Sequence, residues 1–211
     1  MTPIVKICGV TRVEDAVRAV ELGATWIGLN LWPGSPRAIG PDRARAIARA
    51  VAGRVGLAGV FVEAPLAEIE AAVDLVGLDL VQLHGKVPPA DLEALAAAGR
   101  LLLPFRGVPA QAAIEAGPAA TLYLVDAAHP TLLGGTGQAW DFAALAGLRF
   151  PAPVLAAGGI RPENVVAALA GSGADGVDVA SGVESAPGIK DPEKMERLFL
   201  EVRRVANAPS S

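Results

Sequence analysis

The chain has 211 residues, of which 52% are hydrophobic and 4% aromatic, and it carries a formal net charge of −4. This length favours one domain, and the short apolar runs and the mixed, mildly acidic charge argue against a membrane span, a signal peptide and a nucleic-acid partner. One cysteine and two histidines exclude an intrachain disulfide framework and disfavour a metal site, so we expect a cytoplasmic protein without a metal ion.

Short runs rich in β-branched residues alternate with alanine-rich helical stretches along the chain. Gly23, Gly77 and Gly173 stand where a helical stretch meets the next apolar run, a place at which glycine commonly ends a helix. Repeated helix-to-strand units with short connections imply parallel strands and right-handed crossovers. Eight such units favour an α/β fold, a single (β/α)8 TIM barrel, over an open doubly wound sheet. The predicted strands are residues 4–8, 25–30, 57–62, 79–84, 101–105, 121–126, 153–157 and 175–180.

The starts of three helices carry recognisable signals. Thr11 and Glu14 have the spacing of a capping box and predict the start of the first helix. Pro41 and Pro192 fit the first turn of two further helices, the second of them after Asp191 as the N-cap residue. The last helix is predicted to be amphipathic, because apolar residues recur at helical spacing at Met195, Leu198, Phe199, Val202 and Val205.

The organisation of the chain is otherwise uniform, with no linker between parts. Residues 106–120 contain two glycines and two prolines, so we expect the crossover after the fifth strand to be short or irregular. We expect one catalytic barrel domain over residues 1–206 and a disordered tail at 207–211.

Polar residues stand at the carboxyl ends of the predicted strands, where barrel enzymes carry their chemistry. Cys8 and Asp126 each end a strand, and strand alternation places Lys6 on the same lumen-facing side as Cys8. As a general base Cys8 would need a lowered pKa, which Lys6 could supply, and a carboxylate at the mouth could serve as a general acid. The alternatives are a buried, inert cysteine and an aspartate that caps a helix or lies solvated in a loop.

Other candidate residues surround this pair. Lys6 and Asp178 lie on the first and last strands, which become neighbours when a barrel closes, so they fit a lumen ion pair or a supporting role. His84 fits a supporting site residue or an internally satisfied lumen residue. Arg37 lies in a proline-stiffened loop and suits a carboxylate, although a solvated arginine is the commoner outcome.

Two glycine-rich loops follow the last two predicted strands. Gly158 and Gly159, together with Ser181 and Gly182, could present backbone N–H groups to a phosphate, or they could form ordinary tight turns. Residues 134–137, Gly-Gly-Thr-Gly, suit a mobile loop over the site, and the alternative is a disordered segment without a role.

Taken together, these motifs resemble the phosphoribosylanthranilate isomerase family of tryptophan biosynthesis. Two segments match it loosely, residues 103–106 and the alanine-containing run 155–159, and neither includes Cys8 or Asp126. The resemblance extends over nearly the whole chain, because its segments follow in family order at residues 6–9, 35–37, 59–62, 81–85, 124–126, 134–137, 158–160 with 162–165, and 181–184 with 187–191.

The resemblance implies an aldose–ketose isomerase that performs an Amadori rearrangement without a cofactor. It implies that Asp126 is the general acid that opens the ribose ring and that Cys8 is the general base that removes the C2′ proton. Arg37 would face the anthranilate carboxylate, and the loops after the seventh and eighth strands would hold the phosphate. The expected partner is a small phosphorylated substrate, and the expected state is a monomer or a homodimer.

Other functions stay open at this point. The isomerase of the histidine pathway performs the same rearrangement, and that family is expected to use two aspartates, one of them at the end of the first strand. This chain has Cys8 at that position, which argues against that function. A metal-dependent epimerase would need more histidines than His84 and His129, and a class I aldolase would need a Schiff-base lysine, for which Lys6 is a candidate. A non-catalytic barrel that binds a phosphorylated metabolite or a protein would keep the phosphate loops without turnover.

Overall fold

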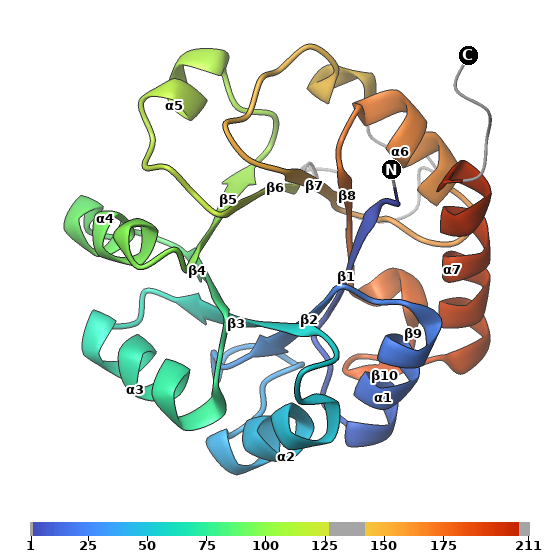
Figure 1. The fold of residues 1–211 in the computed structure, drawn as a ribbon, viewed down its shortest axis with the longest axis horizontal. Coiled ribbons are helices and arrows are strands. Elements are labelled where there is room, and N and C mark those ends of the chain that lie inside the picture. Colours follow the sequence, from blue (N-terminus) through green and yellow to red (C-terminus); the bar gives the residue numbers. More distant parts are fainter. Residues whose placement is uncertain (1, 127–141, 207–211) are drawn as a thin grey trace.

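The computed structural model of the chain describes residues 2–126 and 142–206. Eight parallel strands close into a barrel in sequence order, and β1 pairs with β8 to complete the ring (Figure 1). The predicted α/β barrel is confirmed, and each predicted strand agrees with the observed one within one residue at either end. The strands are β1 (Ile4–Cys8), β2 (Trp26–Asn30), β3 (Gly56–Val62), β4 (Leu80–His84), β5 (Leu101–Arg106), β6 (Leu122–Asp126), β7 (Val154–Ala157) and β8 (Gly176–Val179).

Helices cover the outside of this ring (Figure 1). The predicted irregular crossover after β5 is confirmed, because its helix α5 has only five residues. No helix in the described part of the chain is long and apolar enough to cross a membrane. The α-helices are α1 (Val13–Leu22), α2 (Pro41–Val51), α3 (Leu66–Val76), α4 (Pro89–Ala97), α5 (Gln111–Glu115), α6 (Val165–Ser172) and α7 (Pro192–Ala206), and two 3-10 turns are η1 (Phe142–Leu145) and η2 (Ser181–Val183).

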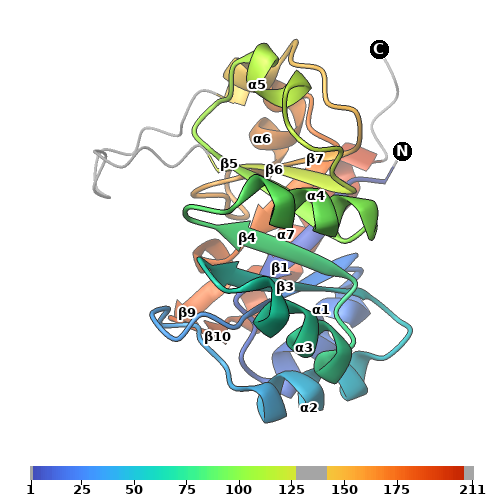
Figure 2. The same ribbon diagram turned by 90° about the vertical axis from the view of Figure 1, so that its left-hand side faces the viewer.

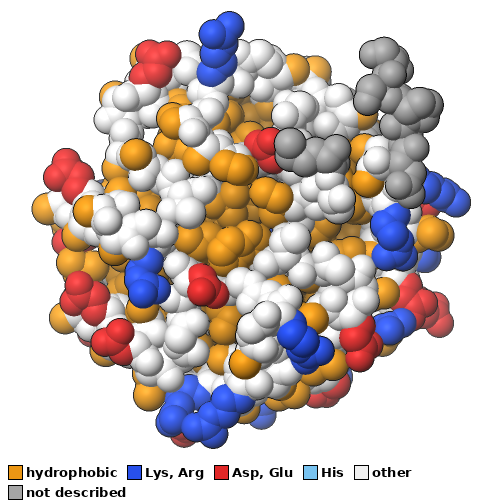
Figure 3. All heavy atoms as spheres, in the orientation of Figure 1, with side chains coloured by type: hydrophobic (Ala, Val, Ile, Leu, Met, Phe, Trp, Pro, Cys, Tyr) orange, Lys and Arg blue, Asp and Glu red, His pale blue; other side chains and the backbone are white. Residues whose placement is uncertain are grey.

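The barrel has two apolar layers. The larger lies between strands and helices, and the smaller fills the lumen, where Ile4 and Trp26 pack against it. In the orientation of Figure 1, hydrophobic side chains gather at the centre of the visible face (Figure 3). Along β4 the lumen-facing residues change from Leu80 to Gln82 and then His84, so the lumen becomes polar toward the carboxyl ends of the strands. The buried lumen residues are Ala58, Leu80, Leu102, Leu122, Leu124, Leu155 and Ala157.

The helix ends agree with most of the sequence signals. Gly23, Gly77 and Gly173 all adopt left-handed conformations, with φ of 109°, 77° and 65°. Asp191 caps α7, because its Oδ1 accepts hydrogen bonds from the N–H groups of Glu193 at 3.0 Å and Lys194 at 3.1 Å. The four residues predicted to line the buried face of α7, Met195, Leu198, Phe199 and Val202, are buried, and Val205 is partly buried against the same core.

The predicted capping box at the start of α1 is wrong. Arg12 occupies the N-cap position and makes no side-chain capping bond. The Thr11 hydroxyl instead donates to the carbonyl oxygen of Gly188 at 2.5 Å. The Thr11 side chain therefore bonds to a residue far away in the sequence instead of capping α1 as the local pattern predicts.

That partner belongs to a hairpin that the sequence pattern did not predict. β9 (Glu184–Ala186) and β10 (Ile189–Lys190) are antiparallel and pair Glu184 with Lys190. Pro187 and Gly188 form the turn, and Gly188 has a φ of 80°, which favours glycine. Figure 2 shows the hairpin at one end of the barrel. The glycine-rich loop at 134–137 and the tail at 207–211 lie outside the described residues.

Candidate active site

Lys6 is the centre of a polar cluster inside the lumen. Its side chain is fully buried, and its Nζ donates to Asp178 Oδ1 on β8 and to Gln82 Oε1 on β4, both at 2.9 Å. Burial alone would lower the pKa of Lys6, but Asp178 and Cys8 outweigh burial and raise it. The lumen ion pair suggested by the neighbouring strands is therefore present, and Lys6 remains charged.

His84 continues this cluster toward the mouth of the barrel. Its Nε2 lies 2.8 Å from Nε2 of Gln82. Because Gln82 Oε1 accepts from Lys6, the Gln82 amide nitrogen is the donor, so His84 Nε2 accepts and the ring proton sits on Nδ1. Burial, aided by Arg106 and Lys6, lowers the pKa of His84 to about 4. His84 is thus a neutral ring at physiological pH.

Cys8 ends β1 at the rim of the same lumen and is half-buried. Gly28 on β2 makes room for it, since a Cβ at Gly28 would lie 2.7 Å from the Cys8 Sγ. Burial raises the pKa of Cys8, and Lys6 and Lys190 lower it without overcoming burial. The prediction that Lys6 gives Cys8 a lowered pKa is therefore wrong in its net result, although Lys6 acts in the expected direction.

Asp126 ends β6 and is half-buried. Its backbone oxygen accepts from Gly107 N at 2.7 Å, which fixes the end of the strand. Two strands, β7 and β8, separate β6 from β1 in the ring. Cys8 and Asp126 therefore approach the mouth from different sides, and the loops after β7 and β8 close the arc between them.

The loops after β7 and β8 touch each other. Gly158 and Gly159 have left-handed φ values of 95° and 67°. A Cβ at Gly182 would lie 1.9 Å from the carbonyl oxygen of Ile160, so only glycine allows this approach. Among the described residues, the N–H groups of Gly159, Ile160, Ser181 and Gly182 meet no hydrogen-bond acceptor. The paired loops thus offer backbone donors, the kind of group that binds a phosphate.

Arg37 lies in the loop between β2 and α2 and is paired with a carboxylate. Its Nε and one terminal nitrogen donate to the two oxygens of Glu184, at 2.8 and 2.7 Å. The aliphatic part of Arg37 packs over Gly9, where a Cβ would lie 2.4 Å from its Cδ. The interpretation of Arg37 as a solvated loop residue is therefore wrong, and the guanidinium stands next to the end of β1.

Two residues of this site, Glu184 and Lys190, were not singled out from the sequence. Lys190 is fully buried, and its Nζ donates to Cys8 O at 2.6 Å, Ala180 O at 3.1 Å and Glu184 Oε1 at 2.9 Å. The available signal was the Pro-Gly pair between two short runs, which is typical of a hairpin.

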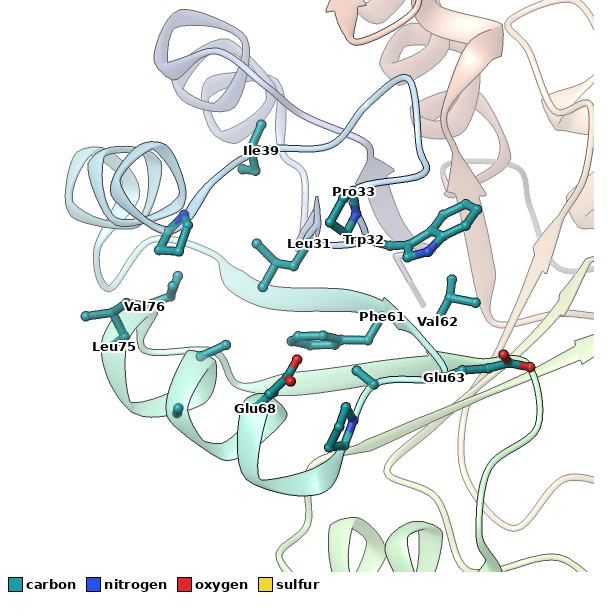
Figure 4. A pocket seen from close by; sticks show the side chains of 15 residues that line it. Leu31, Trp32, Pro33, Ile39, Phe61, Val62, Glu63, Glu68, Leu75 and Val76 are labelled. Atoms are coloured by element: carbon teal, nitrogen blue, oxygen red, sulfur yellow. The ribbon is translucent and has the colours of Figure 1, made fainter.

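A separate apolar hollow of about 490 Å³ lies between α2, β3 and α3 (Figure 4). Leu31 and Phe61 point into it, the Glu68 carboxylate lies beside Phe61, and the ring of Trp32 is turned away from both apolar side chains (Figure 4). Neither Cys8 nor Asp126 lines this hollow, so it is distinct from the candidate site at the mouth of the barrel.

Comparison with known proteins identifies the family of the chain. The family model described as N-(5'phosphoribosyl)anthranilate (PRA) isomerase matches residues 5–201. A protein of Citrifermentans bemidjiense named N-(5'-phosphoribosyl)anthranilate isomerase is 41% identical over 202 residues, covering 96% of this chain and 98% of its own.

Solved structures give the same result. Phosphoribosyl anthranilate isomerase from Thermus thermophilus superimposes with a TM-score of 0.84 at 38% identity, covering 96% of this chain and 99% of that one. Another isomerase of this name, solved with reduced 1-(o-carboxyphenylamino)-1-deoxyribulose 5-phosphate, has a TM-score of 0.80 at 30% identity, with coverage of 96% and 99%. The chain belongs to the N-(5'-phosphoribosyl)anthranilate isomerase family.

Proposed function

We propose that this chain converts N-(5-phosphoribosyl)anthranilate to 1-(2-carboxyphenylamino)-1-deoxyribulose 5-phosphate, with Cys8 as general base and Asp126 as general acid. The observation that carries the proposal is the position of these two side chains, each at the carboxyl end of its strand, on different sides of one mouth. Family membership supplies the reaction, an aldose–ketose isomerisation in tryptophan biosynthesis. The relative solved with the reduced product supports the phosphorylated ligand class.

The reaction needs one proton donor and one proton acceptor. Asp126 gives a proton to the ribose ring oxygen, the C1′–O bond breaks, and the anthranilate nitrogen forms a Schiff base with C1′. The thiolate form of Cys8, which Lys6 and Lys190 favour against burial, then removes the C2′ proton. The electron pair of the broken C2′–H bond neutralises the Schiff base and leaves an enol, which becomes the ketone when C1′ takes up a proton and the C2′ hydroxyl loses one. Each of these two groups can contribute a factor of roughly 10²–10⁴ to the rate.

The ends of the substrate fit the two flanks of the mouth. The anthranilate carboxylate binds Arg37, which provides a planar, charged donor beside Cys8. The phosphate binds the backbone N–H groups of Gly158, Gly159, Ser181 and Gly182. Lys6, His84 and Asp178 support the site from the lumen below.

The wider setting follows from the same assignment. We infer one catalytic domain over residues 1–206 that acts in the cytoplasm on a small phosphorylated substrate, as a monomer or a homodimer and without a nucleic-acid partner. The net charge of −4 supports the last point.

The test is a fluorescence assay in which freshly generated phosphoribosylanthranilate loses its anthranilate signal after the protein is added. We expect Cys8→Ala and Asp126→Asn each to lower kcat by about 10²-fold or more. Both variants should bind the reduced product analogue nearly as tightly as the wild type, as measured by calorimetry, because neither substitution removes a group that holds the carboxylate or the phosphate.

The matched control is Asp79→Asn, the same substitution at the opposite end of the barrel, where Asp79 Oδ2 accepts from Leu57 N at 2.8 Å. It should leave kcat unchanged. A wild-type rate no faster than the spontaneous reaction would refute the function, and near-normal kcat in either site variant would refute that residue's role.

A further inference from the structure

Glu184 holds Arg37 in one orientation at the mouth of the barrel. The side chain of Glu184 is 4% exposed and accepts hydrogen bonds from Arg37, from Lys190 Nζ and from Gly188 N. Burial alone would raise the pKa of Glu184, but the bonds from Arg37 and Lys190 outweigh burial and lower it. The carboxylate is therefore charged and fixed by partners on three sides.

The pairing uses only one edge of the guanidinium. Glu184 takes Nε and Nη2, and Nη1 of Arg37 donates to no acceptor in residues 2–126 and 142–206. A guanidinium has a second two-nitrogen edge, formed by Nη1 and Nη2, which can receive another carboxylate in the same forked geometry. The stem of Arg37 rests on Gly9, so this edge is held close to the end of β1.

The charges in the cluster add up to one free positive charge. Arg37 carries +1 and Glu184 carries −1. Burial lowers the pKa of Lys190, and the hydrogen bond that it donates to Glu184 acts against that shift, so we count the ammonium of Lys190 as +1. Lys190 is fully buried, and its three donors are used by Glu184 and by the carbonyls of Cys8 and Ala180. Lys190 therefore compensates Glu184 from below, which leaves the charge of Arg37 available to a ligand.

We propose that Glu184, held by the buried Lys190, is a positioning residue that orients Arg37 for the substrate's anthranilate carboxylate. This inference rests on the proposed function, because it assigns the carboxylate of that substrate to the free edge of Arg37. Glu184 makes no contact with the reacting carbons. It acts through the orientation of the guanidinium.

The test compares two substrates, phosphoribosylanthranilate and N-(5-phosphoribosyl)aniline, which lacks the carboxylate. In Glu184→Gln one carboxylate oxygen is replaced by an amide NH2 group, which is a donor and cannot accept a hydrogen bond from Arg37. We therefore expect the guanidinium to leave its wild-type orientation. We expect the kcat/KM ratio of the first substrate over the second to fall about tenfold or more, the factor typical of a hydrogen bond to a charged group. The loss should be mainly in KM.

The sign of the change separates orientation from simple electrostatics. Glu184→Gln increases the local positive charge by one unit, so a purely electrostatic role would make carboxylate binding tighter and raise the ratio. Glu184→Asp keeps the charge with a shorter side chain and should fall between the wild type and Glu184→Gln. In an Arg37→Met background, Glu184→Gln should cause little further loss, since the two residues then act as one unit.

The matched control is Asp15→Asn. Asp15 is also buried, pairs with Arg12 through two bonds of 2.9 and 2.7 Å, and accepts from the backbone N–H of Lys190 at 3.0 Å. It does not touch Arg37, so its loss should lower stability and leave the substrate ratio unchanged.

Each outcome decides a different question. If the wild type turns over neither substrate, the proposed function fails and this inference fails with it. If the wild type is active but Glu184→Gln affects both substrates equally, or raises the ratio, only the positioning role of Glu184 is overturned. Should Glu184→Gln fail to fold, the ratio in Glu184→Asp decides, and an unchanged ratio there would overturn the role.

Discussion

Cys8 shows how one residue depends on the charges around it. Its pKa is raised by burial and by Asp178 and lowered by Lys6 and Lys190, with burial the largest effect. A thiol is neutral when protonated, so a nearby ammonium stabilises the thiolate and removal of that ammonium raises the pKa. We expect Lys6→Met to shift the thiol titration of Cys8 to higher pH than in the wild type.

The measurement is the thiolate absorbance near 240 nm as a function of pH. The chain has one cysteine and one tyrosine, so a Cys8→Ser variant provides the blank, including the tyrosine signal. The double variant Lys6→Met/Asp178→Asn should titrate below Lys6→Met alone, because it also removes the anion that raises the pKa. An unchanged or lower midpoint in Lys6→Met would show that Lys6 does not act on the thiol.

Single residues differ in how far the sequence could identify them. Cys8, Asp126 and Asp178 end strands or lie on the lumen face, and strand alternation was enough to predict these positions. Glu184 could not be found in this way, because its partner Arg37 lies 147 positions away in the chain. The net pKa of Cys8 could not be predicted either, since it depends on burial by other strands.

The ends of the helices follow local rules that can be tested one at a time. Gly77 ends α3 with a φ of 77°, and a Cβ there would meet nothing within 4 Å. Gly77→Ala therefore measures only the energetic cost of placing alanine in a left-handed backbone conformation, without any steric collision. We expect it to lower the free energy of unfolding by about 1 kcal/mol in a urea titration.

The matched control is Gly40→Ser at the start of α2. Gly40 also has open space around its Cβ position, but its φ is −77°, an ordinary value, and serine is a good N-cap residue. Gly40→Ser should be neutral or slightly stabilising. A similar loss of stability in both variants would mean that the cost at Gly77 does not come from its backbone conformation.

The helices and strands could be predicted where their signal lies in a short stretch of sequence. The prediction failed where a contact with a distant residue took the place of the local one. The strands and the glycine-ended helices depend on alternation and on one residue's φ, both of which can be read from short windows. The capping box at Thr11 failed because the hairpin β9–β10 brings Gly188 to its hydroxyl. The strands of this hairpin have three residues in β9 and two in β10, which is too short for an alternation pattern to reveal them.

At the scale of the whole molecule, the barrel depends on the seam between β1 and β8. Their register pairs Ile4 with Gly176 and Lys6 with Asp178, and the ion pair of Lys6 crosses the seam. A Cβ at Gly176 would lie 2.0 Å from the carbonyl oxygen of Ile4 and 2.6 Å from its Cβ. The absence of a side chain at Gly176 therefore allows the first and last strands to come close enough to close the ring.

Gly176→Ala should consequently cost more than Gly77→Ala, about 3 kcal/mol or more in the same urea titration, because the strands must move apart. The closest contact is with the backbone of Ile4, so a second substitution that removes the Ile4 Cβ, Ile4→Gly, should restore little of the lost stability. If Gly176→Ala cost little in the Ile4→Gly background, only the two Cβ atoms would collide. A loss no larger than that of Gly77→Ala would mean that the seam tolerates a methyl group and that its closure does not depend on this glycine.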